Sequence, residues 1–236
     1  MRLPARSAAD VHLADAFGRP GCPVCTEVAR ADGLWLESIL AESVNDVGFR
    51  QTLDNARGFC RRHAREVLDA DRRRAGSLGA AILLRASLVA RLGEIEAAHA
   101  AKGWTRARRA EEASRRPACP GCAREAATTA WVAGAIVRLA EVADWSDATG
   151  TAPFCLDHLV LLFRERATSP GWAAAEARQL ERLRDLRDLL DGFAHASSHD
   201  RRHLQTDEQR AAVDAAADLL AGDTARSRNH ANETRP

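Results

Sequence analysis

The chain contains no tyrosine, only six phenylalanines and a single methionine among its 236 residues. Aromatic and β-branched side chains favour strands, whereas the Ala, Leu, Arg and Glu that dominate this sequence favour helices. The shortage of aromatic residues therefore argues against a protein built on sheets. A chain of this length can bury one large core or two small ones. We expect an all-α fold.

Long apolar runs are missing as well. The N-terminal residues lack the apolar region of a secretory signal, and no stretch approaches the roughly 18 apolar residues of a membrane span. We therefore expect a cytoplasmic protein without membrane contact. A formal net charge of +1, with 28% of residues charged, leaves no global field that would attract nucleic acid. Any basic patch must be local.

Sequence signatures of common enzymes are absent too. The chain has no Gly-x-Ser-x-Gly elbow, no P-loop, no Gly-x-Gly-x-x-Gly and no His-Glu-x-x-His. These absences favour a non-enzymatic role. They leave open an enzyme that works through one metal ion with a labile histidine ligand.

The six cysteines fall into two copies of one pattern. Cys22-Pro23-Val24-Cys25 returns as Cys119-Pro120-Gly121-Cys122, and Cys60-Arg61-Arg62-His63 returns as Cys155-Leu156-Asp157-His158. The intervals between the halves, 26–59 and 123–154, are 34 and 32 residues long, and both have helical periodicity. The predicted fold is two repeated helical modules, each pinned by one metal site, with an additional C-terminal helix.

The ligand types point to zinc. We predict one ion held by Cys22, Cys25, Cys60 and His63, and a second held by Cys119, Cys122, Cys155 and His158. Paired cysteines in a reducing compartment bind metal more often than they form disulfides, and four such ligands make the closed tetrahedron of structural zinc. Three cysteines and a histidine can also hold an iron–sulfur cluster, which remains the alternative cofactor. Buried core thiols or a thioredoxin-like redox pair would not use every cysteine in two equivalent quartets.

Helical periodicity and turn residues divide the chain further. Helices are expected directly after each Cys-x-x-His motif, then over about 77–101 with a stripe of Leu84, Leu88, Leu92 and Ile95, and over about 171–195. Thr206-Asp207-Glu208-Gln209 resembles a capping box that opens a last helix, which Gly222 ends. The predicted segments are an N-terminal arm at 1–18, module one at 19–101, an Arg-rich linker at 102–117, module two at 118–196, and a C-terminal helix with a polar, disordered tail at 197–236.

Two further features have competing interpretations. His195, His199 and His203 are four residues apart and would suit a third metal site, but a solvated connection between helices is the interpretation we favour. The Arg-rich linker could bind phosphate, although Glu111 and Glu112 within it favour local ion pairs instead. Trp35, Trp131, Trp145 and Trp172 are expected in the core.

The runs Cys22-Pro23-Val24-Cys25, Ser43-Val44-Asn45-Asp46, Gly58-Phe59-Cys60-Arg61-Arg62-His63 and Gly79-Ala80-Ala81-Ile82-Leu83 resemble a family of uncharacterised bacterial proteins with tandem Cys-Pro-x-Cys and Cys-x-x-His motifs. The resemblance implies a bacterial cytoplasmic protein. The second copy departs from the pattern because it lacks the Val-Asn-Asp sequence and has Pro153 where Gly58 stands.

From these observations we expect a non-enzymatic helical scaffold or adaptor, stabilised by two zinc ions, that binds a protein partner. Nucleic acid is a less favoured partner, reached through the Arg-rich linker. The alternative function is a metal–thiolate redox or metal sensor, or an iron–sulfur electron carrier.

Overall fold

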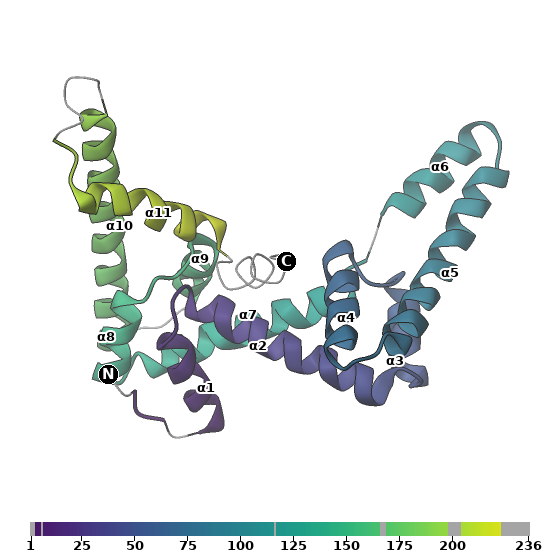
Figure 1. Ribbon diagram of the computed structural model, residues 1–236, viewed down its shortest axis with the longest axis horizontal. Coiled ribbons are helices and arrows are strands. Elements are labelled where there is room, and N and C mark those ends of the chain that lie inside the picture. The colour runs from purple at the N-terminus through teal and green to yellow at the C-terminus, as the bar shows by residue number, and fades with distance from the viewer. Residues whose placement is uncertain (1–2, 6, 116, 166–168, 198–203, 223–236) are drawn as a thin grey trace. The chain divides into compact units, whose positions relative to one another are not determined.

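The computed structural model describes residues 3–5, 7–115, 117–165, 169–197 and 204–222, and within these ranges it contains helices and turns but no strand (Figure 1). The expected all-α fold is confirmed. None of the described helices is long and apolar enough to cross a membrane. In chain order the elements are α1 (Ala8–Phe17), α2 (Pro23–Ser38), the π-helical turn η1 (Ile39–Ser43), α3 (Val47–Asn55), α4 (Arg61–Arg73), α5 (Leu78–Ala100), α6 (Gly103–Ser114), α7 (Pro120–Leu139), α8 (Ala143–Thr151), α9 (Leu156–Arg164), α10 (Pro170–Ala196) and α11 (Asp207–Ala221).

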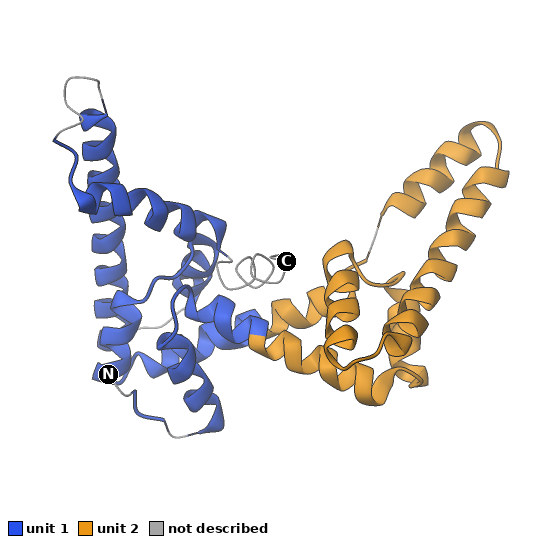
Figure 2. Ribbon diagram, viewed as in Figure 1, with its two compact units in different colours: residues 1–29, 129–236 blue, residues 30–128 orange. Residues whose placement is uncertain are grey.

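The helices form two compact units, each with its own hydrophobic core (Figure 2). Unit 1 comprises residues 1–29 and 129–236, and unit 2 comprises residues 30–128. Trp145 and Phe154 are buried in the unit 1 core, and Leu53 and Val67 are buried in the unit 2 core. The two units differ from the two consecutive modules expected from the repeat, because unit 2 is inserted into the sequence of unit 1.

Both unit boundaries fall inside a helix. The interval after Cys25 begins with α2, which has 16 residues and continues through η1, and the interval after Cys122 is mostly α7, which has 20 residues. The helical periodicity expected in these intervals is thus confirmed. The predicted buried face of α7 is wrong at Trp131, which is 49% exposed, while the next residue, Val132, is fully buried.

Five other helices lie where the sequence indicated, whereas α1, α3 and α8 were not predicted. The helices expected after the two Cys-x-x-His motifs are α4 and α9, the helix expected at 77–101 is α5, and the helix expected at 171–195 is α10. Thr206 and Gln209 form the reciprocal capping box of α11, and Gly222 ends that helix with a φ of 69°. The polar tail after Gly222 lies outside the described residues.

The segment predicted as an Arg-rich linker forms helix α6, which packs against α5. Its C-terminal carbonyls are held by two arginines of unit 2. Arg57 Nη1 donates to the carbonyls of Glu112 and Arg115 at 2.8 and 2.7 Å, and Arg91 Nη1 donates to the carbonyl of Ala113 at 2.8 Å. These bonds satisfy groups that a helix end otherwise leaves without partners, so the segment is part of the folded unit.

Candidate metal centres

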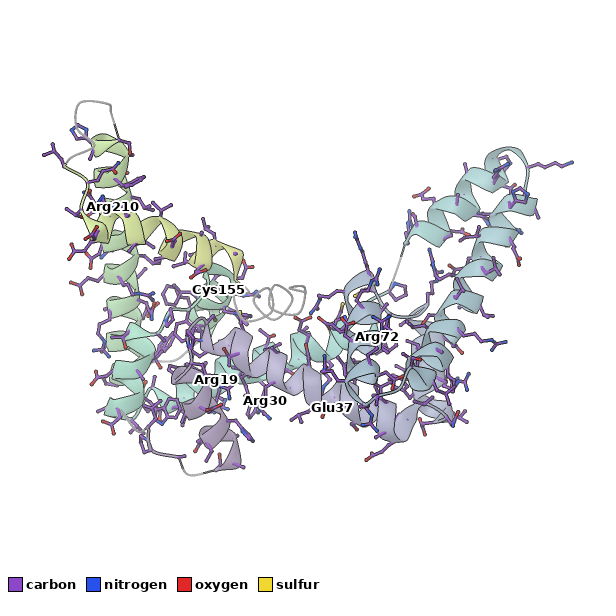
Figure 3. The ribbon with its side chains drawn as sticks, in the orientation of Figure 1. Arg19, Arg30, Glu37, Arg72, Cys155 and Arg210 are labelled. Atoms are coloured by element: carbon purple, nitrogen blue, oxygen red, sulfur yellow. The ribbon has the colours of Figure 1, made fainter. Side chains whose placement is uncertain are left out.

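Each of the four cysteine motifs lies at the N-terminus of a helix. Cys22 and Cys119 directly precede α2 and α7, while Cys60 and Cys155 are the N-cap residues of α4 and α9. Figure 3 labels Cys155 at the start of α9. A helix N-terminus carries partial positive charge, which favours the thiolate form that binds metal. The helices expected directly after the Cys-x-x-His motifs thus begin within those motifs.

The unit 1 site consists of Cys22, Cys25, Cys155 and His158, whose ligand atoms all lie within 4.8 Å of one another. His158 Nδ1 is 3.5 Å from Cys22 Sγ, 3.2 Å from Cys25 Sγ and 3.1 Å from Cys155 Sγ. The Sγ atoms of Cys25 and Cys155 are 3.8 Å apart. The helices α2 and α9 thus present their N-termini to one point.

The unit 2 site consists of Cys60, His63, Cys119 and Cys122, gathered within the same 4.8 Å limit. His63 Nδ1 is 3.2 Å from Cys60 Sγ, 3.3 Å from Cys119 Sγ and 3.5 Å from Cys122 Sγ. The sulfur of Cys122 is 3.3 Å from that of Cys119 and 3.7 Å from that of Cys60. The N-termini of α4 and α7 meet here.

These spacings fit a single tetrahedral ion. With Zn–S bonds of about 2.3 Å and Zn–N bonds of about 2.0 Å, a tetrahedron has edges of about 3.8 Å between sulfurs and about 3.5 Å between sulfur and nitrogen. The distances given above for the two sites fall between 3.1 and 3.8 Å. All six cysteines are free thiols, and the sulfurs are too far apart for a disulfide bond of about 2.05 Å. Both donor sets therefore fit a metal ion.

The predicted grouping of the ligands is wrong, although all eight predicted residues take part. The structure joins each Cys-x-x-Cys motif to the Cys-x-x-His motif of the other copy, so neither Cys22/Cys25/Cys60/His63 nor Cys119/Cys122/Cys155/His158 forms a cluster. The reason is the length of the helices that follow the first motifs. At 1.5 Å per residue, α2 extends about 24 Å and α7 about 30 Å. Each helix carries the chain away from its own first two ligands.

The thiols of the unit 1 site have different pKa values. Hydrogen bonding with Cys155 and then with Cys25 lowers the pKa of the Cys22 thiol to about 3, despite its burial. The same close sulfurs, Cys155 first, raise the pKa of Cys25 far above its ordinary value. One thiolate is readily formed, and its negative charge then opposes the next ionisation. A divalent cation would supply the charge that lets the remaining thiols ionise.

In the unit 2 site, too, the pKa of one thiol is raised and that of another is lowered. Burial, followed by hydrogen bonding with Cys119 and Cys60, raises the pKa of Cys122 to about 12. Burial also acts to raise the pKa of Cys60, but hydrogen bonds from the backbone of His63 and from the neighbouring thiols outweigh it and lower that pKa. Metal binding at this site must therefore displace at least the proton of Cys122 at neutral pH.

The imidazole of His63 is fully buried and lies directly against the Cys-x-x-Cys turn of its site. A Cβ atom added to Gly121 would lie 2.3 Å from Cδ2 of His63, closer than side chains approach. The corresponding position in the first copy is Val24, which is also fully buried. The two sites share donor types but differ in how the turn packs.

Three carboxylates lie close to the imidazole of His63. Since Nδ1 faces the thiols, Nε2 is the atom available to them, and it lies 3.7 Å from Oε2 of Glu66. Asp32 and Glu125 each place a carboxylate oxygen within 4.8 Å of the His63 ligand atom. Arg62 pairs with both Glu66 and Glu125. Carboxylates in this position accept the second ring N–H of a ligating histidine and fix the tautomer that binds metal.

Sequence reasoning missed these carboxylates. Glu66 follows His63 by three residues, and that helical spacing could have identified it. Asp32 and Glu125 come from α2 and α7, and no local pattern connects them to His63.

The end of α11 lies against the unit 1 site. The thiol of Cys25 donates to the backbone carbonyl of Gly222, and a Cβ atom added to Gly222 would lie 3.5 Å from Cys155 Sγ. The glycine predicted only to end the last helix therefore also lies against the unit 1 site. The third site considered from sequence does not gain support, because His199 and His203 lie outside the described residues.

Comparison with known proteins gives one match. No curated protein and no solved structure is similar enough to match the chain. A family model described as a family of unknown function (DUF6062) matches residues 6–169, which include all eight ligands and exclude α10 and α11. The resemblance inferred from the tandem motifs is borne out to that extent, and the chain belongs to the family of unknown function DUF6062.

Proposed function

We propose that this protein binds two zinc ions, one in each unit, and acts as a non-enzymatic helical scaffold for a protein partner. The observation that carries the proposal is the convergence of eight donors into two closed sets of four. A closed tetrahedron leaves no coordination position for a substrate or a reactive water. Structural zinc also contributes apparent binding free energies of about 10–16 kcal/mol, as much as an ordinary domain's whole stability.

The donor geometry favours zinc over an iron–sulfur cluster. The thiolates of such a cluster bind several different iron atoms, whereas each set of donors here surrounds one point. Three thiolates and an imidazole suit zinc better than harder cations such as magnesium or calcium. Reduced thiols in both sites also agree with a reducing, cytoplasmic compartment.

The arginines of α6 favour a protein partner over nucleic acid. Arg108 and Arg115 pair with Glu112 and Glu111 four residues away, at 3.3 and 2.6 Å. Arg109 donates to the carbonyl of Ala97 at 3.0 Å. Side chains engaged within their own unit are less available for phosphates, and the helical packing of this segment supports a structural role for it.

The proposal is tested by zinc content in two pairs of serine substitutions. The purified chain should contain two zinc ions by elemental analysis. Cys22→Ser/Cys155→Ser removes two ligands of one site and should retain one zinc. Cys22→Ser/Cys60→Ser removes one ligand from each site and should retain little or none.

Two outcomes would contradict the proposal. One is that protein purified without oxygen contains iron and sulfide and absorbs visible light, which would show that a cluster is bound and not zinc. Retention of one zinc in Cys22→Ser/Cys60→Ser, together with none in Cys22→Ser/Cys155→Ser, would restore the grouping within each copy and refute the sites described above.

A second candidate function, a metal–thiolate redox sensor, is favoured by the partial exposure of Cys60 together with its lowered pKa. An accessible thiolate is the form that peroxide attacks. In the Cys22→Ser/Cys155→Ser variant, where only the unit 2 site remains, mild peroxide should then release zinc, as followed with a chromogenic chelator. Retention of zinc under those conditions supports the structural role alone.

A further inference from the structure

Helix α5 has an apolar stripe that the unit 2 core does not use. The α5 stripe is defined by positions spaced alternately four and three apart, of which Ala81, Leu88, Leu92 and Ile95 are apolar and Arg85 and His99 are polar. This spacing is the heptad pattern with which helices pair in coiled coils. It extends over nearly the whole length of α5, which spans Leu78–Ala100.

The large apolar side chains of the stripe are exposed to solvent, although such side chains are usually buried. Leu88 is 67% exposed, Leu92 47% and Ile95 56%, and Val89 beside them is 55% exposed. Contiguous large apolar side chains on a surface mark an interaction site. Leu88, Leu92 and Ile95 belong to the apolar stripe expected from the sequence, and the structure leaves all three exposed.

The buried side of α5 already packs against other helices of unit 2. Ala80, Leu83 and Ala98 are buried, and α5 packs against α3, α4 and α6. At about 100° per residue, Leu83 lies across the helix axis from Leu88 and Leu92, whereas Ala80 and Ala98 lie roughly 100° round the axis from them. The exposed stripe is therefore a second, separate packing face.

The charges on this face identify the occupant. Arg85 lies near one end of the exposed apolar residues and Glu96 near the other, both exposed, and among the described residues the structure gives neither an ion pair within the chain. An antiparallel pairing that sets Leu88 opposite the second copy's Leu92 places Arg85 beside the second copy's Glu96. Twofold symmetry forms this ion pair twice. A parallel pairing would instead set Arg85 against Arg85.

We propose that two copies of this chain associate through the α5 stripe as an antiparallel helix pair. Leu88 and Leu92 form the centre of the interface, Ile95 and Val89 flank it, and the two Arg85–Glu96 pairs fix its register. The association is independent of the metal proposal, because no ligand residue belongs to α5.

The first test is the mass of the purified full chain by sedimentation velocity over a range of concentrations. The protein should be a dimer that dissociates on dilution. Leu88→Glu/Leu92→Glu should be monomeric, and Val160→Glu, which charges a similarly exposed valine of α9, should remain a dimer. Unchanged zinc content and helical circular dichroism show that each variant is folded.

The second test addresses the register. Arg85→Glu alone and Glu96→Arg alone each replace two attractions by two repulsions and should raise the dissociation constant roughly tenfold. The combined substitution Arg85→Glu/Glu96→Arg should restore it. If the α5 stripe bound a different protein instead, that protein would carry no matching substitution, and the combined variant would not recover the affinity.

Several results would overturn the proposal. A chain that is monomeric at about 100 μM, far above the Kd of an ordinary specific complex, has no such interface. A dimer that persists in Leu88→Glu/Leu92→Glu uses another surface. Binding of the monomer to lipid vesicles or to a different protein through the α5 stripe would assign the stripe to that occupant instead.

Discussion

At the scale of single residues, the two metal sites are not interchangeable. Gly121 allows His63 to lie against the turn of the unit 2 site, whereas Val24 occupies the same position in the other motif. We predict that Gly121→Ala lowers the zinc content from two to one per chain, because the added methyl group overlaps the imidazole. Val24→Ala, which shortens the matching residue, should leave both ions bound. Two zinc ions in Gly121→Ala would show that the ring of His63 can move away without cost to the site.

A second residue-scale prediction concerns the carboxylates beside His63. Loss of a partner that orients a ligating histidine typically weakens metal binding about 10–100-fold. We expect Asp32→Leu, measured in the Cys22→Ser/Cys155→Ser background by competition with a chelator, to weaken zinc binding within that range. Asp32→Asn keeps a hydrogen-bond acceptor and should weaken it less. If wild-type chain binds a third metal ion that Asp32→Leu abolishes, the carboxylates are ligands and not orienting groups.

The titration of the thiols sets the pH dependence of metal binding. Cys122 has a pKa raised to about 12, so at neutral pH without metal it keeps a proton that zinc must displace. Zinc affinity at the unit 2 site is therefore predicted to rise with pH between 6 and 8, about tenfold per pH unit for each proton released. Chelator competition in the Cys22→Ser/Cys155→Ser variant measures this slope. A flat profile would mean that the thiols are already ionised before metal binds.

At the scale of helices, the sequence revealed where elements begin and end better than what they contact. Caps and turns are local, and the capping box at Thr206 and the end of α11 at Gly222 could both be predicted. The ligand types could also be predicted, because each Cys-x-x-Cys or Cys-x-x-His motif is local in the sequence. Their grouping could not, because it depends on how far α2 and α7 run before the chain turns. The exposure of Trp131 likewise depends on which neighbouring helix packs beside it.

Helix α6 shows how tertiary contacts override a polar sequence. Arg57 adopts a positive φ of 59° and donates to two carbonyls at the end of α6, while its Nε atom pairs with Glu94 at 2.8 Å. We predict that Arg57→Ala destabilises unit 2 by about 1 kcal/mol, the net contribution of a typical hydrogen bond, because both carbonyls are exposed and water can reach them. Faster amide hydrogen exchange in α6, with no change in α10, would locate the effect. Arg106→Ala, which replaces an exposed arginine of α6 itself, is the control.

At the scale of the whole molecule, the sites join segments that are distant in sequence. Cys25 and Cys155 are 130 residues apart, and His63 and Cys119 are 56 residues apart, so the second link is nested within the first. Each link closes one unit, and each unit has its own hydrophobic core. With an ion bound at each site, we expect the stability of each unit to depend chiefly on its own ion, and the dependence of one unit on the other to be unequal.

The inequality follows from chain connectivity and can be measured. Unit 1 consists of two segments that are joined only through unit 2, whereas unit 2 is one continuous segment. Cys60→Ser/Cys122→Ser should remove the unit 2 metal, abolish slow amide exchange at Leu53 and Val67, and also weaken protection at Ile136, because unfolded unit 2 becomes a long loop within unit 1. Cys22→Ser/Cys155→Ser should abolish protection at Ile136 and leave Leu53 and Val67 protected, because unit 2 keeps its metal and a continuous chain. Loss of protection in both units in this second variant would mean that the chain folds as a single cooperative structure, and that its two metal sites stabilise one core between them.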